Sequence, residues 1–583
     1  MIVLMNTFND GWSGLPFKVA YAGVSVTPPK DNITTLTLAV RDVIYPMDYI
    51  QKQLRLPPQK PDAVITDSML DALREYSESR FVKVTGIGMP AELISTCPHL
   101  TSRLWLENDI IPLVVDCDKV AMEGDQNTPW GHRALDEQAE VLAMKCVRVF
   151  GPLNIPILQV GYRGLVEVNS HFHMHIASLE NYQNTVGAQT WDILQIIASE
   201  VRPKELRIAL FSATPQGGGV ALIRHAFVRL GRLLDLDIKC NRYWASDGGP
   251  LDDPSNGGAD IIVVDHPQMP DLIQIAKERS PARPVIYRSH IQIRMDLAET
   301  PHTPQARTWN WLWKRAQHAD IFISHPIPDS VPRDVPKAMV GYIPASTDIL
   351  DGLNKDMRDW DIAHYGRIFN QWCKEAGMPT VDYPTEKYFA QVARFDPSKG
   401  LFDALDGYSM FYDHVQKTSS STKVPKLVIC GHGSVDDPDA TGTYQAVLER
   451  IDEKMPRLKD LICVIRAKPS DQVLNAILSK AKIILQLSTC EGFEIKVSEA
   501  LRKGKPVIAT NLWSDEGLYN RLHSHALRAI RDEVTAVGHL ASLLYLLSKL
   551  TKDKNWKPQS QLMPKSMVGE FKPTGRSPLH SAL

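Results

Sequence analysis

The pattern of hydrophobic and polar positions along the chain changes near residue 205. Beyond that point, short β-rich runs alternate with amphipathic segments such as 221–234 and 308–319. This alternation is typical of parallel βαβ units, in which a helix connects two neighbouring strands. The first series of predicted strands comprises residues 206–211, 260–265, 284–287, 320–324 and 339–343.

A second series of the same kind follows a looser stretch at about 351–384. Its predicted strands are residues 388–393, 426–430, 461–466, 482–487 and 506–510. Two doubly wound domains place a crevice between them, with the carboxyl ends of the strands facing one another where ligands bind. We therefore expect an α/β fold of two parallel-sheet domains, 205–385 and 386–550. Residues 551–583 are rich in Lys, Pro and Ser and are expected to be disordered.

Residues 1–185 predict a mixed α+β extension before these domains. Alternating stretches at 34–40 and 81–86 have the pattern of strands, and 124–131 has the composition of a loop. His171, His173 and His175 would share one face of a strand, where three imidazoles can bind a metal. No neighbouring cysteine or carboxylate completes such a site, so we favour a half-exposed strand face and predict no metal.

Composition and charge narrow the classes of partner. A chain of 583 residues is too long for a single hydrophobic core, so several domains are expected. Its 44% hydrophobic and 23% charged residues are typical of a soluble globular protein. The net charge is −2 without a basic stripe, which argues against nucleic acid or an anionic membrane as a partner. Eight scattered cysteines, no basic region near the N-terminus and no apolar run of about 18 residues lead us to expect a cytoplasmic protein.

A Gly-rich loop is the sharpest local motif. Gly217, Gly218 and Gly219 follow the first predicted strand of the 205–385 domain and directly precede a helix. Three glycines let the backbone approach an anion, and the helix start supplies free N–H groups and the positive end of its dipole. A tight turn would need fewer glycines, so we expect a phosphate or sugar-phosphate site. The pattern is neither GxGxxG nor a Walker motif and indicates neither NAD nor ATP.

Two cations flank a turn in the second domain. Arg394 and Lys399 surround the sequence FDPS after a predicted strand. They can converge on a phosphate, with Arg supplying a planar fork of donors and Lys a point charge. An ordinary helix-start turn would explain the same residues, so spacing alone leaves both interpretations open.

Three further side chains are candidates for contact with a sugar. Glu491 is expected in the loop after the strand 482–487, and Glu499 lies eight residues on, near the same helix face. Paired carboxylates can hold sugar hydroxyls, although acids near a helix start are also stabilised by the dipole. In the first domain, His290 follows Arg288 at the end of a strand and can donate a hydrogen bond, although a lone histidine is more often structural.

Taken in order, these segments resemble the retaining GT-B glycosyltransferases, specifically the fungal trehalose phosphorylase and clock-controlled protein group, which carries a link to biological rhythms. The resemblance extends over residues 205–510. It rests on SATPQGGGVALIRHA, ADIIVVDHPQMPDLI, RPVIYRSHIQIRMDL, QHADIFISHP, VGYIPASTDILDGLNK, QVARFDPSKGL and STCEGFEIKVSEALRKGKPVIAT.

The resemblance implies a reaction and a set of site residues. Enzymes of this group convert α,α-trehalose and inorganic phosphate reversibly to glucose and α-glucose 1-phosphate, with retention and without a metal, nucleotide or other cofactor. The resemblance assigns phosphate binding to Arg394 and Lys399, the reacting glucosyl unit to Glu491, and a contact from the opposite domain to His290. It assigns substrate binding to the remaining candidates, Gly217, Gly218, Gly219, Arg288 and Glu499.

Two departures from the group's pattern keep other functions open. Residues 236–240 lead almost directly to 243–247, where the group would have several tens of further residues, and NLWSDEGLYNRL follows residue 510 in place of a Gly-rich loop and strand. One alternative is a UDP-sugar-dependent retaining glycosyltransferase, since paired glutamates also occur there. The other is a shortened, inactive relative with a binding or regulatory role. A homo-oligomer formed through the N-terminal region is compatible with the sequence.

Overall fold

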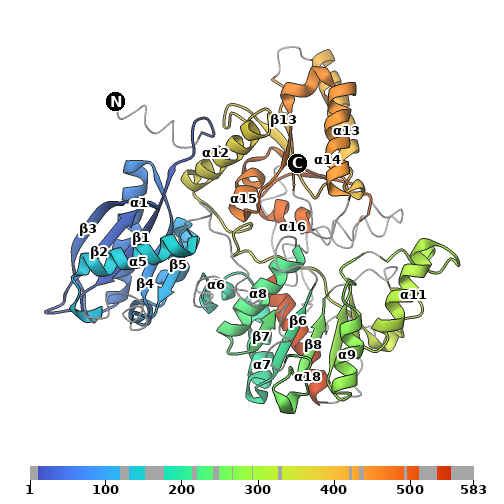
Figure 1. The fold of residues 1–583 in the computed structure, drawn as a ribbon, viewed down its shortest axis with the longest axis horizontal. Helices are drawn as coiled ribbons and strands as arrows, with labels where there is room; N and C mark the ends of the chain where they lie inside the picture. Colours follow the sequence, from blue (N-terminus) through green and yellow to red (C-terminus); the bar gives the residue numbers. More distant parts are fainter. Residues whose placement is uncertain are drawn as a thin grey trace, which may run out of the picture.

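The computed structural model describes most of the chain as three β-sheets with their covering helices (Figure 1). The described residues are 11–117, 130–150, 176–212, 219–240, 249–265, 267–291, 293–325, 331–418, 423–431, 439–490, 495–510 and 535–552. The histidines at 171–175 and the predicted tail from 553 onward lie outside them. Among the described helices, none has the length and apolarity needed to cross a bilayer.

The N-terminal unit is a five-stranded mixed sheet, which confirms the mixed fold predicted for this region. Its order is β3-β2-β1-β4-β5, antiparallel on the β3 side and parallel between β1, β4 and β5. Gly23 and Gly88 let helix α5 (Leu135–Phe150) pack against one face, since a Cβ at Gly23 would lie 2.0 Å from the carbonyl oxygen of Ala139. The strands are β1 (Lys18–Val26), β2 (Ile33–Arg41), β3 (Pro46–Arg55), β4 (Val82–Pro90) and β5 (Ile111–Val115). Helices α1 (Pro61–Arg80) and α3 (Leu100–Asn108) contribute to the core on the other face.

The first lobe is built on a six-stranded parallel sheet in the order β11-β10-β9-β8-β6-β7. Every predicted strand of the first series is present, and β7 is an additional edge strand. Alternation divides the strand residues between two cores: Ile208 and Leu210 face one side, Ala209 and Phe211 the other. The strands are β6 (Arg207–Phe211), β7 (Asp237–Cys240), β8 (Ile261–Val264), β9 (Val285–Arg288), β10 (Ile321–Ser324) and β11 (Val340–Tyr342).

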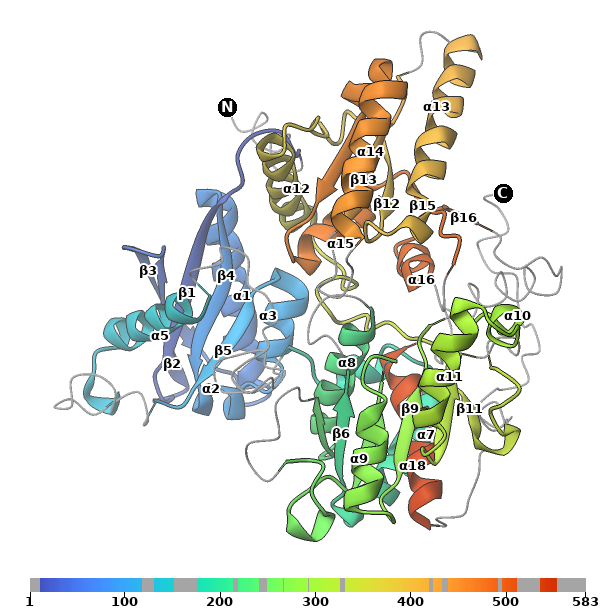
Figure 2. The same ribbon diagram turned by 45° about the vertical axis from the view of Figure 1, so that its right-hand side comes forward.

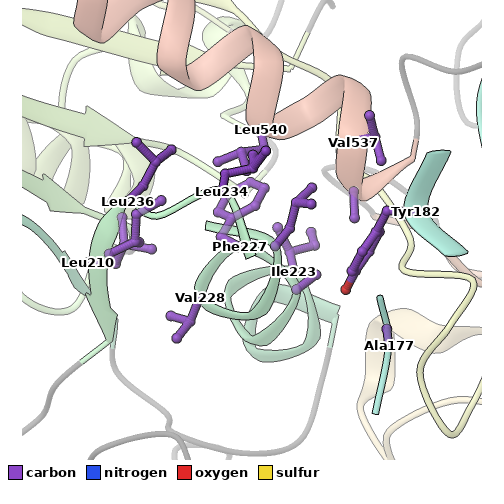
Figure 3. Close-up of a cluster of buried hydrophobic side chains, with 14 of the residues drawn as sticks. Ala177, Tyr182, Leu210, Ile223, Phe227, Val228, Leu234, Leu236, Val537 and Leu540 are labelled. Atoms are coloured by element: carbon purple, nitrogen blue, oxygen red, sulfur yellow. The ribbon is translucent and has the colours of Figure 1, made fainter. Parts of the chain in front are cut away.

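Helices cover both faces of the first lobe. Helices α9 (Asp271–Arg279) and α11 (Pro304–Ala316) pack on one face. On the other face, α7 (Ala188–Val201) and α8 (Gly219–Leu233) pack with α18 (Ala536–Lys552), which comes from the far end of the chain. Figure 3 shows Leu540 and Val537 of α18 among the α8 side chains Phe227 and Ile223.

The second lobe is a five-stranded parallel sheet in the order β14-β13-β12-β15-β16 (Figure 2). All five predicted strands are present, as β12 (Tyr388–Val392), β13 (Lys426–Gly431), β14 (Ile462–Arg466), β15 (Ile483–Gln486) and β16 (Val507–Ala509). Helices α13 (Leu401–Thr418) and α14 (Ala440–Lys454) cover one face. Helices α12 (Asp359–Glu375) and α15 (Asp471–Lys480) cover the other, and α16 (Ile495–Arg502) precedes β16.

One prediction between the lobes is wrong. Residues 351–384 were expected to be a looser stretch, but they contain the 17-residue helix α12. Thirteen of its residues are buried, among them polar ones such as Asp361, His364 and Asn370. Ile362, Tyr365 and Phe369 recur at helical spacing and pack in the core of the second lobe, so the apolar stripe of an amphipathic helix was present in the sequence. The polar residues on its other faces are buried by other parts of the molecule.

Both parallel sheets are doubly wound. In each, the chain begins at an inner strand, adds neighbours on one side, and then adds strands on the other side. The direction of winding switches between β6 and β8 in the first lobe and between β12 and β15 in the second. Ligands of such sheets bind beyond the carboxyl ends of the strands at this switch point.

Candidate functional site

The predicted site residues follow the strands at the two switch points or the strand next to one of them. The Gly-rich loop follows β6, Arg394 and Lys399 follow β12, and Glu491 follows β15. His290 follows β9, which pairs with β8. Gly217, Gly218 and Glu491 lie outside the described residues, and Gly219 is the first residue of α8.

The turn that carries the two cations is tightly held. We call residues 394–400 the cation loop. Asp396 caps its 3₁₀ turn, accepting hydrogen bonds from the backbone N–H and the hydroxyl of Ser398 at 2.8 and 2.7 Å. Gly400 has a φ of 62°, and a Cβ there would lie 1.8 Å from the carbonyl oxygen of Leu487. Only glycine fits this position, which brings the start of α13 against the end of β15.

Arg394 and Lys399 gather around the same carboxylate. Nη2 of Arg394 lies 3.5 Å from Oδ2 of Asp396. Burial opposes ionisation of Asp396, but its hydrogen bonds to Ser398 and the charges of Arg394 and Lys399 lower its pKa below the usual value. Convergence of the two cations, left open by spacing alone, is thus supported by their common proximity to Asp396.

In the first lobe, His290 is paired with a carboxylate that sequence reasoning missed. Nε2 of His290 lies 2.5 Å from Oδ1 of Asp265, the residue after β8. Nε of Arg288 lies 3.8 Å from the same oxygen, and both Asp265 and Arg288 are buried. Burial opposes ionisation of Asp265, but the charges of His290 and Arg288 outweigh it and lower the pKa of this carboxyl. The signal was present in the sequence as an Asp at a strand carboxyl end, adjacent to the switch point.

Helix α18 adds a second histidine behind this group. The ring nitrogen Nδ1 of His539 lies 2.7 Å from the hydroxyl of Ser346, in the segment that connects the lobes. His539 is buried, and desolvation followed by the nearby Arg288 and His290 charges holds its pKa well below the usual value. It is therefore a neutral imidazole at neutral pH. No local pattern pointed to it, because its partners lie about 190 to 250 positions earlier in the chain.

Glu499 lies in α16, the helix between β15 and β16 of the second lobe. Its side chain is buried, and Oε2 forms an ion pair with Nζ of Lys496 at 2.7 Å. The other oxygen, Oε1, has no hydrogen-bond partner among the described residues. Burial and then the nearby carboxylates of Asp348, Asp471 and Glu499 raise the pKa of Asp351 well above its usual value. Glu499 is therefore near the segment between the lobes, with an unsatisfied acceptor.

The two lobes approach each other at the helices that follow the candidate loops. Ile495, the first residue of α16, packs against the core of the first lobe. Leu222, in the first turn of α8, packs against the core of the second lobe. Arg294 of the first lobe lies close enough to Cys490 of the second for the two side chains to interact electrostatically. The Gly-rich loop and the glutamate loop thus connect to elements that meet across the lobes. Among the described residues, no cluster of His, Cys, Asp and Glu is arranged to hold a metal ion.

Comparison with known proteins agrees with this architecture. Residues 19–156 match the trehalose phosphorylase-like N-terminal domain, 252–330 the trehalose synthase N-terminal domain, and 379–514 the group 1 glycosyl transferases. The two doubly wound lobes and these matches define a glycosyltransferase of GT-B architecture.

Relatives specify the family more closely. The trehalose phosphorylase of Grifola frondosa is 34% identical over 650 residues, covering 90% of this chain and 88% of the relative. That of Pleurotus pulmonarius is 34% identical over 666 residues, covering 92% and 90%. This chain belongs to the trehalose phosphorylase family. Both alignments are longer than the chain itself, so these relatives contain segments that it lacks.

More distant proteins also match. The trehalose synthase of Pyrococcus horikoshii is 25% identical over 367 residues, covering 57% of this chain and 79% of that protein. Among solved structures, the trehalose-6-phosphate synthase OtsA aligns with a TM-score of 0.39 and 13% identity, covering 60% of this chain and 96% of that one.

Proposed function

We propose that this protein is a retaining trehalose phosphorylase, which converts α,α-trehalose and inorganic phosphate reversibly to glucose and α-glucose 1-phosphate. The observation that carries the proposal is membership of the trehalose phosphorylase family over about nine tenths of the chain. The geometry supports it, because the cation loop follows a strand at one switch point and the polar group of Asp265 and His290 follows strands at or beside the other.

In the proposed reaction, Arg394 and Lys399 hold phosphate at the start of α13. The charges of both side chains act on Asp396, so an anion between the two cations would be bound by charge-assisted hydrogen bonds. The backbone N–H groups of Gly217, Gly218 and Gly219 would add donors from the first lobe. A phosphate oxygen attacks the anomeric carbon as the bond to the departing glucose breaks, and the phosphate proton passes to the departing oxygen.

The remaining side chains would hold the glucosyl unit. Glu491 and Glu499 would bind its hydroxyls, and the unpartnered Oε1 of Glu499 is an acceptor available for this. His290 would contact the sugar from the first lobe, with its ring orientation set by Asp265 and with Arg288 alongside. Attack and departure on one face of the sugar would retain configuration without a protein nucleophile, so Glu491 and Glu499 do not form a glycosidase pair.

We further propose that the protein acts in the cytoplasm on trehalose, glucose, glucose 1-phosphate and phosphate, without nucleotide, metal, nucleic acid or membrane. The scattered thiols and the absence of a basic stripe support this.

The test is release of glucose 1-phosphate from trehalose by the purified full chain, with phosphate and without nucleotide. Phosphate-dependent product is expected. Its absence from protein that melts cooperatively would contradict the proposal. A melting temperature raised by UDP and not by phosphate would then favour the UDP-sugar transferase, and one raised by phosphate without turnover would favour a binding role.

A further inference from the structure

A buried glutamine supports the cation loop from beneath. Gln391 is the penultimate residue of β12, and its side chain is fully buried. Its amide nitrogen Nε2 donates a 2.6 Å hydrogen bond to the backbone carbonyl of Lys399. The acceptor is a carbonyl, so the NH₂ group must face it, and Oε1 on the other side has no hydrogen-bond partner among the described residues.

The neighbouring carbonyl of the loop is held from a different strand. Ser398 accepts hydrogen bonds from the backbone N–H of Thr489 at 2.7 Å and from its hydroxyl at 3.2 Å. Thr489 lies just after β15 and two positions before Glu491. Two consecutive carbonyls of the turn are therefore anchored inward, one to β12 and one to the loop after β15.

We infer that Gln391 is a positioning residue for Lys399, acting through the backbone carbonyl of that lysine. This inference rests on the proposed function, since it assumes that Lys399 binds phosphate. Without the Gln391 donor, the carbonyl of Lys399 would lose the hydrogen bond that anchors it to β12, and the loop could shift from its present position. A displacement of about 1 Å is enough to reduce the use of a bound group by as much as 100-fold.

The first test is the kinetic effect of Gln391→Met, which keeps the side-chain length and removes the donor. The KM for phosphate is expected to rise roughly tenfold or more, while the KM for trehalose stays within about twofold. Gln472→Met is the matched control, because Gln472 is also buried in the second lobe but its amide lies beside Gly352. A lower melting temperature with an unchanged phosphate KM would overturn the inference.

The second test is a double-mutant cycle. If Gln391 acts through Lys399, then Gln391→Met should cost nothing further when combined with Lys399→Met, whereas independent roles would give multiplicative losses. Multiplicative losses would overturn the inference and leave the proposed function intact. If the unaltered protein forms no phosphate-dependent product, the proposed function is wrong. The double-mutant cycle is then measured as the rise in melting temperature that phosphate causes in each variant. If phosphate causes no such rise in the unaltered protein, both the proposed function and the inference about Gln391 are refuted.

Discussion

At the scale of single residues, the cation loop gives the most direct test of the phosphate site. Arg394→Ala and Lys399→Ala are each expected to reduce phosphate-dependent turnover by roughly 100-fold or more, because each removes a charged donor to the same anion. Melting should change little, since the Arg394 side chain is 42% exposed. The control is Lys417→Ala, because Lys417 is exposed near the end of α13, the helix that follows the cation loop. Full activity in either loop variant would show that phosphate binds elsewhere.

His364 predicts an acid-sensitive term in stability. It is fully buried in α12, and desolvation followed by the charge of Lys83 lowers its pKa to about 3. The unfolded chain binds a proton below about pH 6.5 and the folded chain does not, so this group destabilises the fold as pH falls from about 6.5 towards 3. Between pH 7.5 and 5.5 the expected loss is about 1 kcal/mol.

The measurement is urea unfolding of the wild type and His364→Phe at both pH values. Phe suits a position that stacks at 5.5 Å on Phe17 and should reduce the pH dependence by that amount. His318→Gln, at an exposed position, should leave the slope unchanged. An equal slope in His364→Phe would mean that the buried imidazole titrates normally.

At the scale of elements, helix α18 is a structural part of the first lobe although it follows the second lobe in sequence. Leu544 is fully buried against the core shared with α7 and α8. Leu544→Ala is expected to lower the free energy of unfolding by about 2–5 kcal/mol, because it removes apolar contacts and leaves a cavity. Ile196→Ala, at a position 60% exposed on α7, should change it by less than about 0.5 kcal/mol. Equal effects in urea unfolding would show that α18 does not pack stably on this lobe.

Two helices pack on a different lobe from the one in which the predicted domain limits place them. Helix α12 was assigned to the first domain and packs in the core of the second lobe, and α18 was assigned to the second and packs on the first. The described segment 343–358 connects the first lobe to α12. Its Ser346 contacts His539 of α18, and Thr347 pairs with Thr535, the residue just before α18.

At the scale of the whole molecule, a buried charge cluster joins the N-terminal unit to the segment between the lobes. Lys83 of β4 binds Asp361 of α12 at 2.6 Å and Asp109 at 3.0 Å, and Lys355 binds Asp109 at 2.6 Å. All four side chains are at most 2% exposed. Tyr365 also donates to Asp109 at 2.6 Å. The N-terminal sheet is thus joined by buried ion pairs to Lys355, in the segment between the two lobes, and to Asp361 of α12.

Breaking this cluster on one side should be worse than removing both charges. Lys83→Met leaves Asp361 with Arg358 as its remaining cation and Asp109 with Lys355, and the loss of one buried counter-charge is expected to cost about 3–5 kcal/mol of unfolding free energy. Adding Asp361→Asn should recover part of that cost, because it removes the buried carboxylate that lost Lys83. Urea unfolding of the two single variants and the double variant measures the coupling. Strictly additive losses would show that the pair contributes independently.

Local sequence pattern was sufficient to predict the strands of the two parallel sheets and most of the helices between them. Each run predicted in the two parallel sheets is a strand, because buried parallel strands are continuous apolar runs that local composition reveals. The fold class followed from their alternation. Arg394, Lys399 and His290 are candidate site residues because they follow strand carboxyl ends, which are recognisable in order along the chain, and Glu499 is a candidate in the helix after β15.

Which distant residues come into contact depends on the packing of the whole molecule. Asp265 lies 25 positions from His290, Lys83 lies 278 positions from Asp361, and α18 packs on the first lobe although the second lobe precedes it in the sequence. The hydrogen bond from Gln391 to Lys399 spans only eight positions, yet it depends on a turn whose shape is fixed by Leu487 and Thr489. Local pattern reports burial and periodicity, whereas these pairings depend on how sheets and helices pack, and packing brings together residues that share no sequence signal.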